Sequence, residues 1–319
     1  MDNIHTVTDP NRIAQLESLV VEALQGGQPG RFELAPPELI EWDELSSFRF
    51  SFEPEERYEE LDLGIYLKAL ERTDQLADLD AQRLRAHRAE ALDAAGEVIY
   101  RWPIFQCLDG EIRPDDGAVC LLVGGDFFEV APTYLSELDD YIKQLREWPV
   151  AFPASQPDEK EGTYNERVAA TSTDYLMLDR QTVRVNTTTS PIEICDILTR
   201  DGCLVHVKRK LSSSSLSHLF AQGVVSGDLL LMSSEFRKKA IQVIKKAAKA
   251  KKVKPEVFLT FGLNGIIPRE HEIVYGIIAH WEKRLLVDAL PFFSKVNLRR
   301  HTEELKRMGY QVSFRRIDA

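Results

Sequence analysis

Cysteine is scarce in this 319-residue chain, and its four cysteines form no CxxC pair. A zinc ribbon and a disulfide scaffold are therefore not indicated, and Cys195 and Cys203, both in apolar strands, are expected to be small buried residues. No apolar run reaches the length of about 18 residues that a membrane-spanning helix needs. The N-terminal Met-Asp-Asn-Ile-His lacks the basic and apolar regions of a signal peptide, so a cytoplasmic protein without membrane contacts is expected.

Two other features of ligand-binding proteins are missing. The pair Gly124-Gly125 lacks the glycine spacing and the lysine of a nucleotide-binding loop. Aromatic residues are not interleaved with the basic ones, so the aromatic stacking typical of single-strand binding is not indicated.

Charge is distributed unevenly along the chain. The net charge of −11 combines residues 1–150, with 13 Lys and Arg against 32 Asp and Glu, and residues 151–319, with 27 against 19. Thirteen of the later cations lie between Arg200 and Lys254, against three acids. This clustering predicts an anionic partner for the second half. The alternative is that the two halves attract each other.

The helix and strand patterns predict a mixed α/β protein of two domains. Residues 1–150 would form an acidic α/β domain for recognition or regulation, and residues 151–319 a basic domain, with 148–162, which contains three prolines, as the linker. Local patterns predict three further elements, a helix over 76–95, a strand over 229–232 and a basic amphipathic helix over 235–252.

The stretch 191–223 (PIEICDILTRDGCLVHVKRKLSSSSLSHLFAQG) has the strongest pattern in the chain. It predicts a strand, a tight turn at Asp201-Gly202, a second strand, a serine-rich loop and a helix. Because side chains alternate along strands, a three-residue turn would place Asp196 opposite His206, with Lys208 further along the same face. A two-residue turn would shift this register and separate them.

These residue types suit phosphodiester hydrolysis. Carboxylates of Glu166 and Asp196 would bind Mg²⁺ or Mn²⁺, which prefer oxygen ligands, and the carbonyl of Val207 could add another. The metal would polarise the phosphate. Lys208 would stabilise charge in the transition state, and Gln222 would orient substrate or water.

This arrangement resembles the restriction-endonuclease-like superfamily, whose PD…(D/E)xK signature lies on a core of helix, strands, helix and strand. The resemblance assigns Asp196 to the first motif acid, Lys208 to the motif lysine, Glu166 to the helix-borne acid and Gln222 to the glutamine of the following helix. His206 stands where the second acid is expected. The resemblance therefore implies that Glu166, or else Asp179 or Glu193, supplies the missing charge, or that metal catalysis is lost.

A second resemblance rests on longer segments, namely YNERVA, IEICDILT, HVKRKLSSSSLSHLFAQG and LPFFSKVNL…MGYQV. Together these segments are similar to a sporadically distributed family of bacterial proteins of unknown function, from about residue 61 to the end. The family's frequent placement near phage-defence genes implies an antiviral role acting on nucleic acid. DNA is the expected partner, and RNA remains the alternative.

Structural roles compete with these functional ones. Asp196 could simply cap a strand or pair with Lys208. His206, a candidate catalytic residue with Asp196, Lys208 and Gln222, could instead be a buried hydrogen-bonding residue. The serines could cap a helix as well as bind phosphate. The residues expected to contact nucleic acid are Arg209, Lys210, Ser213, Ser215, His218, Lys238, Lys245 and Lys249. The alternative function is a non-catalytic nucleic-acid-binding or sensor protein with the same fold. A homodimer is compatible with either.

Overall fold

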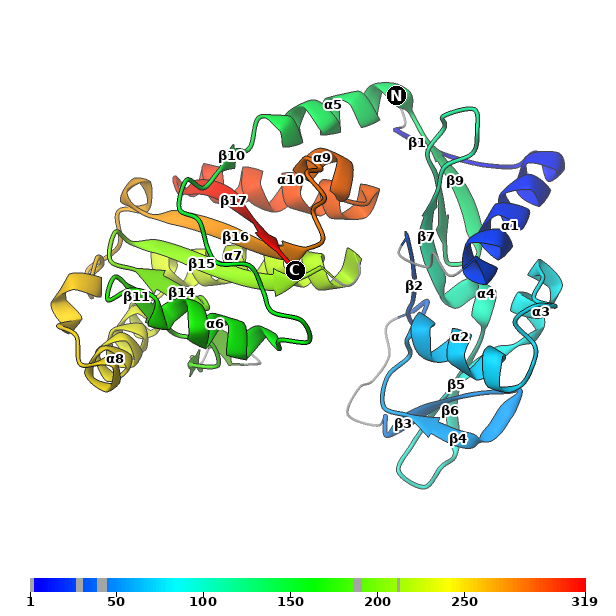
Figure 1. The fold of residues 1–319 in the computed structure, drawn as a ribbon, viewed down its shortest axis with the longest axis horizontal. Helices are drawn as coiled ribbons and strands as arrows, with labels where there is room; N and C mark the ends of the chain where they lie inside the picture. The colour runs from blue at the N-terminus through cyan, green and yellow to red at the C-terminus, as the bar shows by residue number, and fades with distance from the viewer. Residues whose placement is uncertain (1–2, 27–30, 39–44, 186–190, 211–212) are drawn as a thin grey trace. The chain divides into compact units, whose positions relative to one another are not determined.

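The computed structural model describes residues 3–26, 31–38, 45–185, 191–210 and 213–319. It is a mixed α/β protein whose chain forms two compact units, Met1–Glu137 and Leu138–Ala319 (Figure 1). Among the described residues, no helix has both the length and the apolar character needed to cross a membrane.

The first unit packs helices against two antiparallel sheets around one hydrophobic core. Among its described residues, the sheets have the strand orders β1-β9-β8-β7-β2 and β4-β3-β5-β6. The elements are β1 (Ile4–Thr6), α1 (Pro10–Gln25), β2 (Phe32–Leu34), β3 (Ser47–Phe50), β4 (Glu53–Tyr58), α2 (Leu63–Arg72), α3 (Ala81–Ala86), β5 (Arg88–Leu92), β6 (Val98–Pro103), α4 (Ile104–Cys107), β7 (Leu108–Ile112), β8 (Cys120–Val123) and β9 (Asp126–Val130). Helix α5 (Pro132–Lys143) leads into the second unit.

The second unit is built on a six-stranded sheet of order β10-β17-β16-β15-β14-β11. Strands β10, β17, β16 and β15 are parallel, whereas β14 is antiparallel to both of its neighbours. The elements are β10 (Arg146–Glu147), α6 (Glu161–Ala170), β11 (Tyr175–Met177), β12 (Thr182–Val183), β13 (Ile192–Glu193), β14 (Ile197–Thr199), β15 (Cys203–Arg209), α7 (Ser213–Met232), α8 (Ser234–Lys251), η2 (Pro255–Phe258), η3 (Pro268–Glu270), β16 (Glu272–Ala279), α9 (Leu286–Ala289), α10 (Phe292–Arg307) and β17 (Gln311–Asp318).

Both faces of this sheet are covered, which explains why nearly every residue of β16 is buried. On one face, Val205 and Val207 of β15 pack with Tyr164 of α6. On the other, Leu204 packs in a larger core that includes residues of α7, α8 and α10. Alternate residues of β15 therefore reach opposite layers, and the end of the strand lies near both α6 and α7.

The second unit begins before the predicted boundary at 150/151. Strand β10 pairs with β17, and the amide of Trp148 donates to the carbonyl of Phe314 at 2.8 Å. Trp148 and Phe152 are buried with Tyr164 in one cluster. The linker prediction over 148–162 is therefore wrong in its first part, because the aromatic residues beside the prolines belong to the core.

Two local predictions are also wrong. Residues 76–95 form the short helix α3 and the strand β5, because pairing of β5 with β3 and β6 overrides the helix propensity of Ala, Leu, Arg and Glu. Residues 229–232 are the last turn of α7, since four consecutive apolar residues fit a helix or a strand equally well. The basic helix over 235–252 is confirmed as α8. Burial of Cys195 is confirmed, whereas Cys203, at the start of β15, is only partly buried.

Candidate functional site

The hairpin of β14 and β15 has the predicted register. Ile197 pairs with Val205 and Leu198 with Leu204, as a three-residue turn requires. Gly202 ends this turn with φ +81°, a backbone conformation that residues with a side chain rarely adopt. The sequence therefore predicted the turn and the pairing correctly.

Asp196 is held just ahead of β14 by the backbone of β15. Its amide donates to the carbonyl of Val205 at 3.0 Å, and its Oδ2 accepts from the amide of Val207 at 2.6 Å. The side chain is buried. A buried carboxylate with a single hydrogen-bond donor retains lone pairs for another ligand.

Three carboxylates meet at this point. Asp179, Glu193 and Asp196 each have an oxygen within 4.8 Å of those of the other two, and they are called the carboxylate group below. Asp179 comes just after β11, and its amide donates to the carbonyl of Asp196 at 3.1 Å. Glu193 ends β13, and its Oε1 accepts from the amide of Arg180 at 3.2 Å.

Burial and the repulsion of neighbouring charges raise the pKa values of Asp196 and Glu193. Burial, with the nearby charges of Asp179, Glu193 and Glu161, raises the pKa of Asp196 to about 8, although the hydrogen bond from Val207 opposes the shift. Burial and the charge of Asp179 also raise the pKa of Glu193. A proton therefore remains on the group at neutral pH unless a cation replaces it.

Lys208 and Glu161 lie beside the carboxylate group. Lys208 Nζ donates to Glu161 Oε1 at 2.9 Å, and the amide of Arg209 donates to Oε2 at 2.9 Å. Each side chain of the pair is about a third exposed. The charge of Lys208 partly offsets the rise in the pKa of Glu193, so its ammonium group acts on the carboxylates from close by.

Helix α6 supplies different residues from the one predicted. Glu166 is exposed and lies outside the carboxylate group. Glu161 and Asn165 lie nearer, and Asn165 Nδ2 donates to Asp179 Oδ2 at 3.3 Å. Asn165 is buried, and its Oδ1 has no hydrogen-bond partner within the described ranges. A polar residue at the spacing of the buried face of the helix, with Val168 and Ala169, was the signal that could have found it.

His206 occupies the other side of β15 rather than the carboxylate group. Its imidazole is buried beside Tyr275, with Nε2 3.4 Å from Ser226 Oγ of α7. Burial lowers its pKa to about 4, so the ring is neutral. The alternative of a buried structural histidine fits this position better than a catalytic role.

Helix α7 contributes two of the predicted site residues to the lining of a pocket. His218 and Gln222 line a pocket of about 320 Å³ together with Glu193. The helix begins at Ser213, but the side chains of Ser213 and Ser215 lie outside what the structure describes, so the predicted capping and phosphate contacts stay predictions.

The predicted basic contacts divide into internal and exposed residues. Arg209 donates to Ser155 Oγ at 2.6 Å, and Lys210 Nζ donates to the carbonyl of Ala289 at 2.6 Å. Burial lowers the pKa of Lys210. These two residues therefore hold the fold together rather than projecting toward a partner. The remaining three are exposed on α8: Lys238, Lys245 and Lys249.

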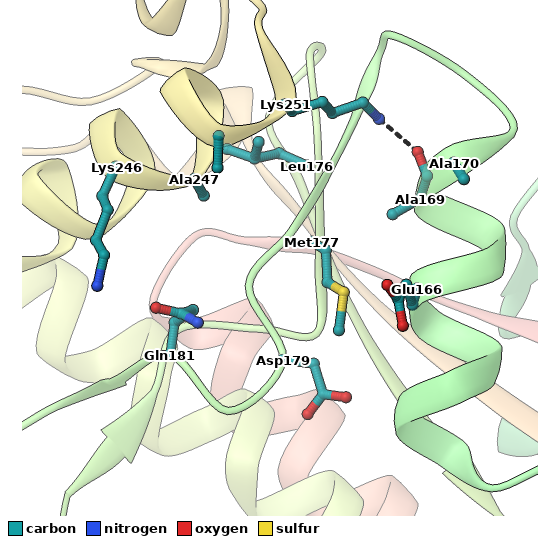
Figure 2. A pocket seen from close by; sticks show the side chains of 11 residues that line it. Glu166, Ala169, Ala170, Leu176, Met177, Asp179, Gln181, Lys246, Ala247 and Lys251 are labelled. Atoms are coloured by element: carbon teal, nitrogen blue, oxygen red, sulfur yellow. Dashed lines mark hydrogen bonds between the residues drawn. The ribbon is translucent and has the colours of Figure 1, made fainter.

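Another pocket lies between α6 and α8 and is called the α6–α8 pocket below (Figure 2). Its lining includes Glu166, Met177, Asp179 and Lys246, and its volume is about 410 Å³. Lys251 closes one end by donating from Nζ to the carbonyls of Ala169 in α6, Ser172 after α6 and Tyr175 in β11.

Replacement of Lys251 tests this closure. In Lys251→Met, the carbonyls of Ala169, Ser172 and Tyr175 lose their shared donor, so the free energy of unfolding should fall by about 1–3 kcal/mol. Lys249→Met, on the exposed face of the same helix, should change it by less than about 0.5 kcal/mol. Urea unfolding measures both, and equal effects would contradict the proposed closure.

Comparison with known proteins gives a family but no activity. No curated protein and no solved structure matches the chain. The family described as "Family of unknown function (DUF6119)" matches residues 1–318, which extends the similarity predicted from about residue 61 onward. The chain belongs to this family of unknown function.

Proposed function

We propose that the second unit hydrolyses phosphodiester bonds of nucleic acid with the help of a divalent cation. The observation that carries this proposal is the convergence of Asp179, Glu193 and Asp196 beside the ammonium group of Lys208. An all-oxygen donor set of high negative charge suits Mg²⁺ or Mn²⁺. Asn165 Oδ1, buried and unpaired within the described ranges, adds a neutral oxygen near Asp179.

Each residue has a role that its contacts support. A bound cation would supply Lewis acidity at the phosphate. Asp196, fixed by the Val207 amide, would be the central ligand, with Asp179 and Glu193 beside it. Lys208, oriented by Glu161, would stabilise the charge that develops on the phosphate oxygens.

The order of elements supports the restriction-endonuclease-like resemblance. Helix α6 precedes the antiparallel strands β11, β14 and β15, after which α7 and α8 lead to β16, parallel to β15. This is the succession of helix, strands, helix and strand that the resemblance implies. We infer DNA as the substrate and antiviral defence as the setting from the same resemblance and the family context.

Charge supports an anionic substrate. The second unit has 29 Lys and Arg against 22 Asp and Glu, whereas the first has 11 against 29. Exposed Lys238, Lys245 and Lys249 would contact phosphates without reading sequence.

One observation favours a non-catalytic binding protein as the second candidate. His206 replaces the expected motif acid and faces Ser226, so it adds no charge to the carboxylate group. A protein of this kind would bind nucleic acid in a salt-sensitive manner without turnover.

Cleavage assays on the full chain separate the two candidates. Plasmid DNA, single-stranded DNA and RNA are each incubated with Mg²⁺, with Mn²⁺ or with EDTA. Cleavage that requires the cation supports hydrolysis. Salt-sensitive binding without cleavage supports the second candidate, and absence of both contradicts a nucleic-acid function.

A further inference from the structure

The α6–α8 pocket has the size and lining of a small-ligand site. Its volume of about 410 Å³ falls in the usual range of about 300–1,000 Å³. Apolar side chains from three elements line it: Ala169 and Ala170 of α6, Leu176 and Met177 of β11, and Ala247 and Ala250 of α8. Such a lining favours a largely apolar group over a fully hydrated one.

Polar groups occur at the edges of this lining. Figure 2 shows the side chain of Glu166 on one side of Met177, those of Gln181 and Lys246 on the other, and that of Asp179 below Met177. The amide of Gln181 can donate and accept, whereas the carboxylate of Glu166 accepts and the ammonium group of Lys246 donates. An occupant therefore needs apolar faces and a polar edge.

The pocket is continuous with the carboxylate group. Asp179 belongs to both, so an occupant of the pocket lies next to the position proposed for the reacting phosphate. The charge of Lys246, on the other side of the pocket, suits a further phosphate of the same strand.

We propose that the α6–α8 pocket is a nucleobase subsite, and that the substrate therefore enters as a single strand or with an unpaired nucleotide. A base has flat apolar faces and a polar edge, and it cannot enter a pocket while it is stacked in a duplex. The inference rests on the proposed function, because it takes a phosphate of the same strand to lie at the carboxylate group. Binding of the base here is by aliphatic contact, which explains why the sequence lacks interleaved aromatic residues.

Filling the pocket tests the proposal. Ala250 is exposed on α8 and lines the pocket, so Ala250→Trp places an indole in it without disturbing a core. Gln242→Trp is the matched control, an exposed position of the same helix that is not among the pocket residues. Fluorescence anisotropy in Ca²⁺ measures binding of a short single-stranded oligonucleotide, the same strand with abasic sites, and a blunt duplex.

The full chain and Gln242→Trp should bind the base-bearing strand at least about tenfold more tightly than the abasic strand or the duplex. Ala250→Trp should bind all three alike. Equal binding of base-bearing and abasic strands by the unaltered chain would overturn the subsite, as would equal behaviour of the two tryptophan variants. Competition by adenosine monophosphate as strong as that by the strand would assign the pocket to a free nucleotide instead.

Cleavage measured in parallel keeps the two proposals distinct. Discrimination against abasic strands without cleavage in Mg²⁺ or Mn²⁺ would contradict the proposed hydrolysis but support the base-binding pocket. Cleavage without such discrimination would contradict the nucleobase subsite but support the proposed hydrolysis. Absence of nucleic-acid binding by the unaltered chain would overturn both.

Discussion

Asp196→Asn is expected to reduce cation-dependent cleavage at least about 100-fold. The amide keeps the size of the carboxylate and can still accept the hydrogen bond from Val207, so the hairpin should remain intact. What is lost is the central negative charge of the carboxylate group. Initial rates on the best substrate in Mg²⁺ measure the effect.

The same variant should be more stable than the unaltered chain when no divalent cation is present. The pKa of the Asp196 carboxyl is raised from 3.8 to about 8, so the folded state holds this proton more tightly than the unfolded chain does. The free energy of unfolding therefore falls as the pH rises between these values, and Asp196→Asn removes this contribution. Thermal unfolding in EDTA should show a gain that increases up to about pH 8 and then levels off.

Addition of Mg²⁺ should reverse the order of stability. A cation that binds only the folded state stabilises it, and the unaltered chain keeps all three carboxylates of the proposed site. Asp201→Asn, an exposed acid in the turn of the same hairpin, is the control and should change neither the rate nor the response to Mg²⁺. Full activity of Asp196→Asn would contradict the assignment of the site.

Lys208→Met should lower the cleavage rate by about 10²–10³-fold and weaken substrate binding much less. The ammonium group is needed when charge develops on the phosphate, whereas ground-state binding is shared among many cations. Its ion pair with Glu161 is about a third exposed, so removing it should cost no more than about 1 kcal/mol of stability.

Glu161→Gln distinguishes chemistry from structure at this pair. It removes the charge of the partner but keeps Lys208 and an oxygen that can accept from the amide of Arg209. Single-turnover rates and urea unfolding should show similar stability for the two variants but much higher activity for Glu161→Gln. Equal losses of activity would mean that Lys208 acts only through the pair.

Local sequence signals predicted the parts of the site that depend on neighbours in the chain. The turn at Asp201-Gly202 fixed the pairing of β14 with β15, and it thereby placed Asp196 against the backbone of Val207. The lysine-rich face of α8 was equally clear, because the period of a helix is visible in the sequence.

Residues that meet through loops could not be placed in the same way. Asp179 and Glu193 were alternatives for the missing acid, and their contact depends on the path between β11 and β13. The choice among the residues of α6 depended on the rotation of the helix about its own axis. This rotation buries Asn165 and leaves Glu166 at the surface. The side chain of His206 followed the expected alternation along β15, but it faces Ser226 of α7 rather than the carboxylate group.

The strand order of the second unit has a consequence for biosynthesis. Strand β17 lies between β10 and β16, yet the ribosome makes Gln311–Asp318 after every other strand of this sheet. Until then β16 presents an unpaired edge, which is prone to aggregation, and β10 has no partner. The nascent chain therefore cannot complete the sheet before its last strand emerges. Chains truncated ahead of Gln311 should be cleared by proteases, so the sheet that carries the carboxylate group is completed only in molecules that contain Gln311–Asp318.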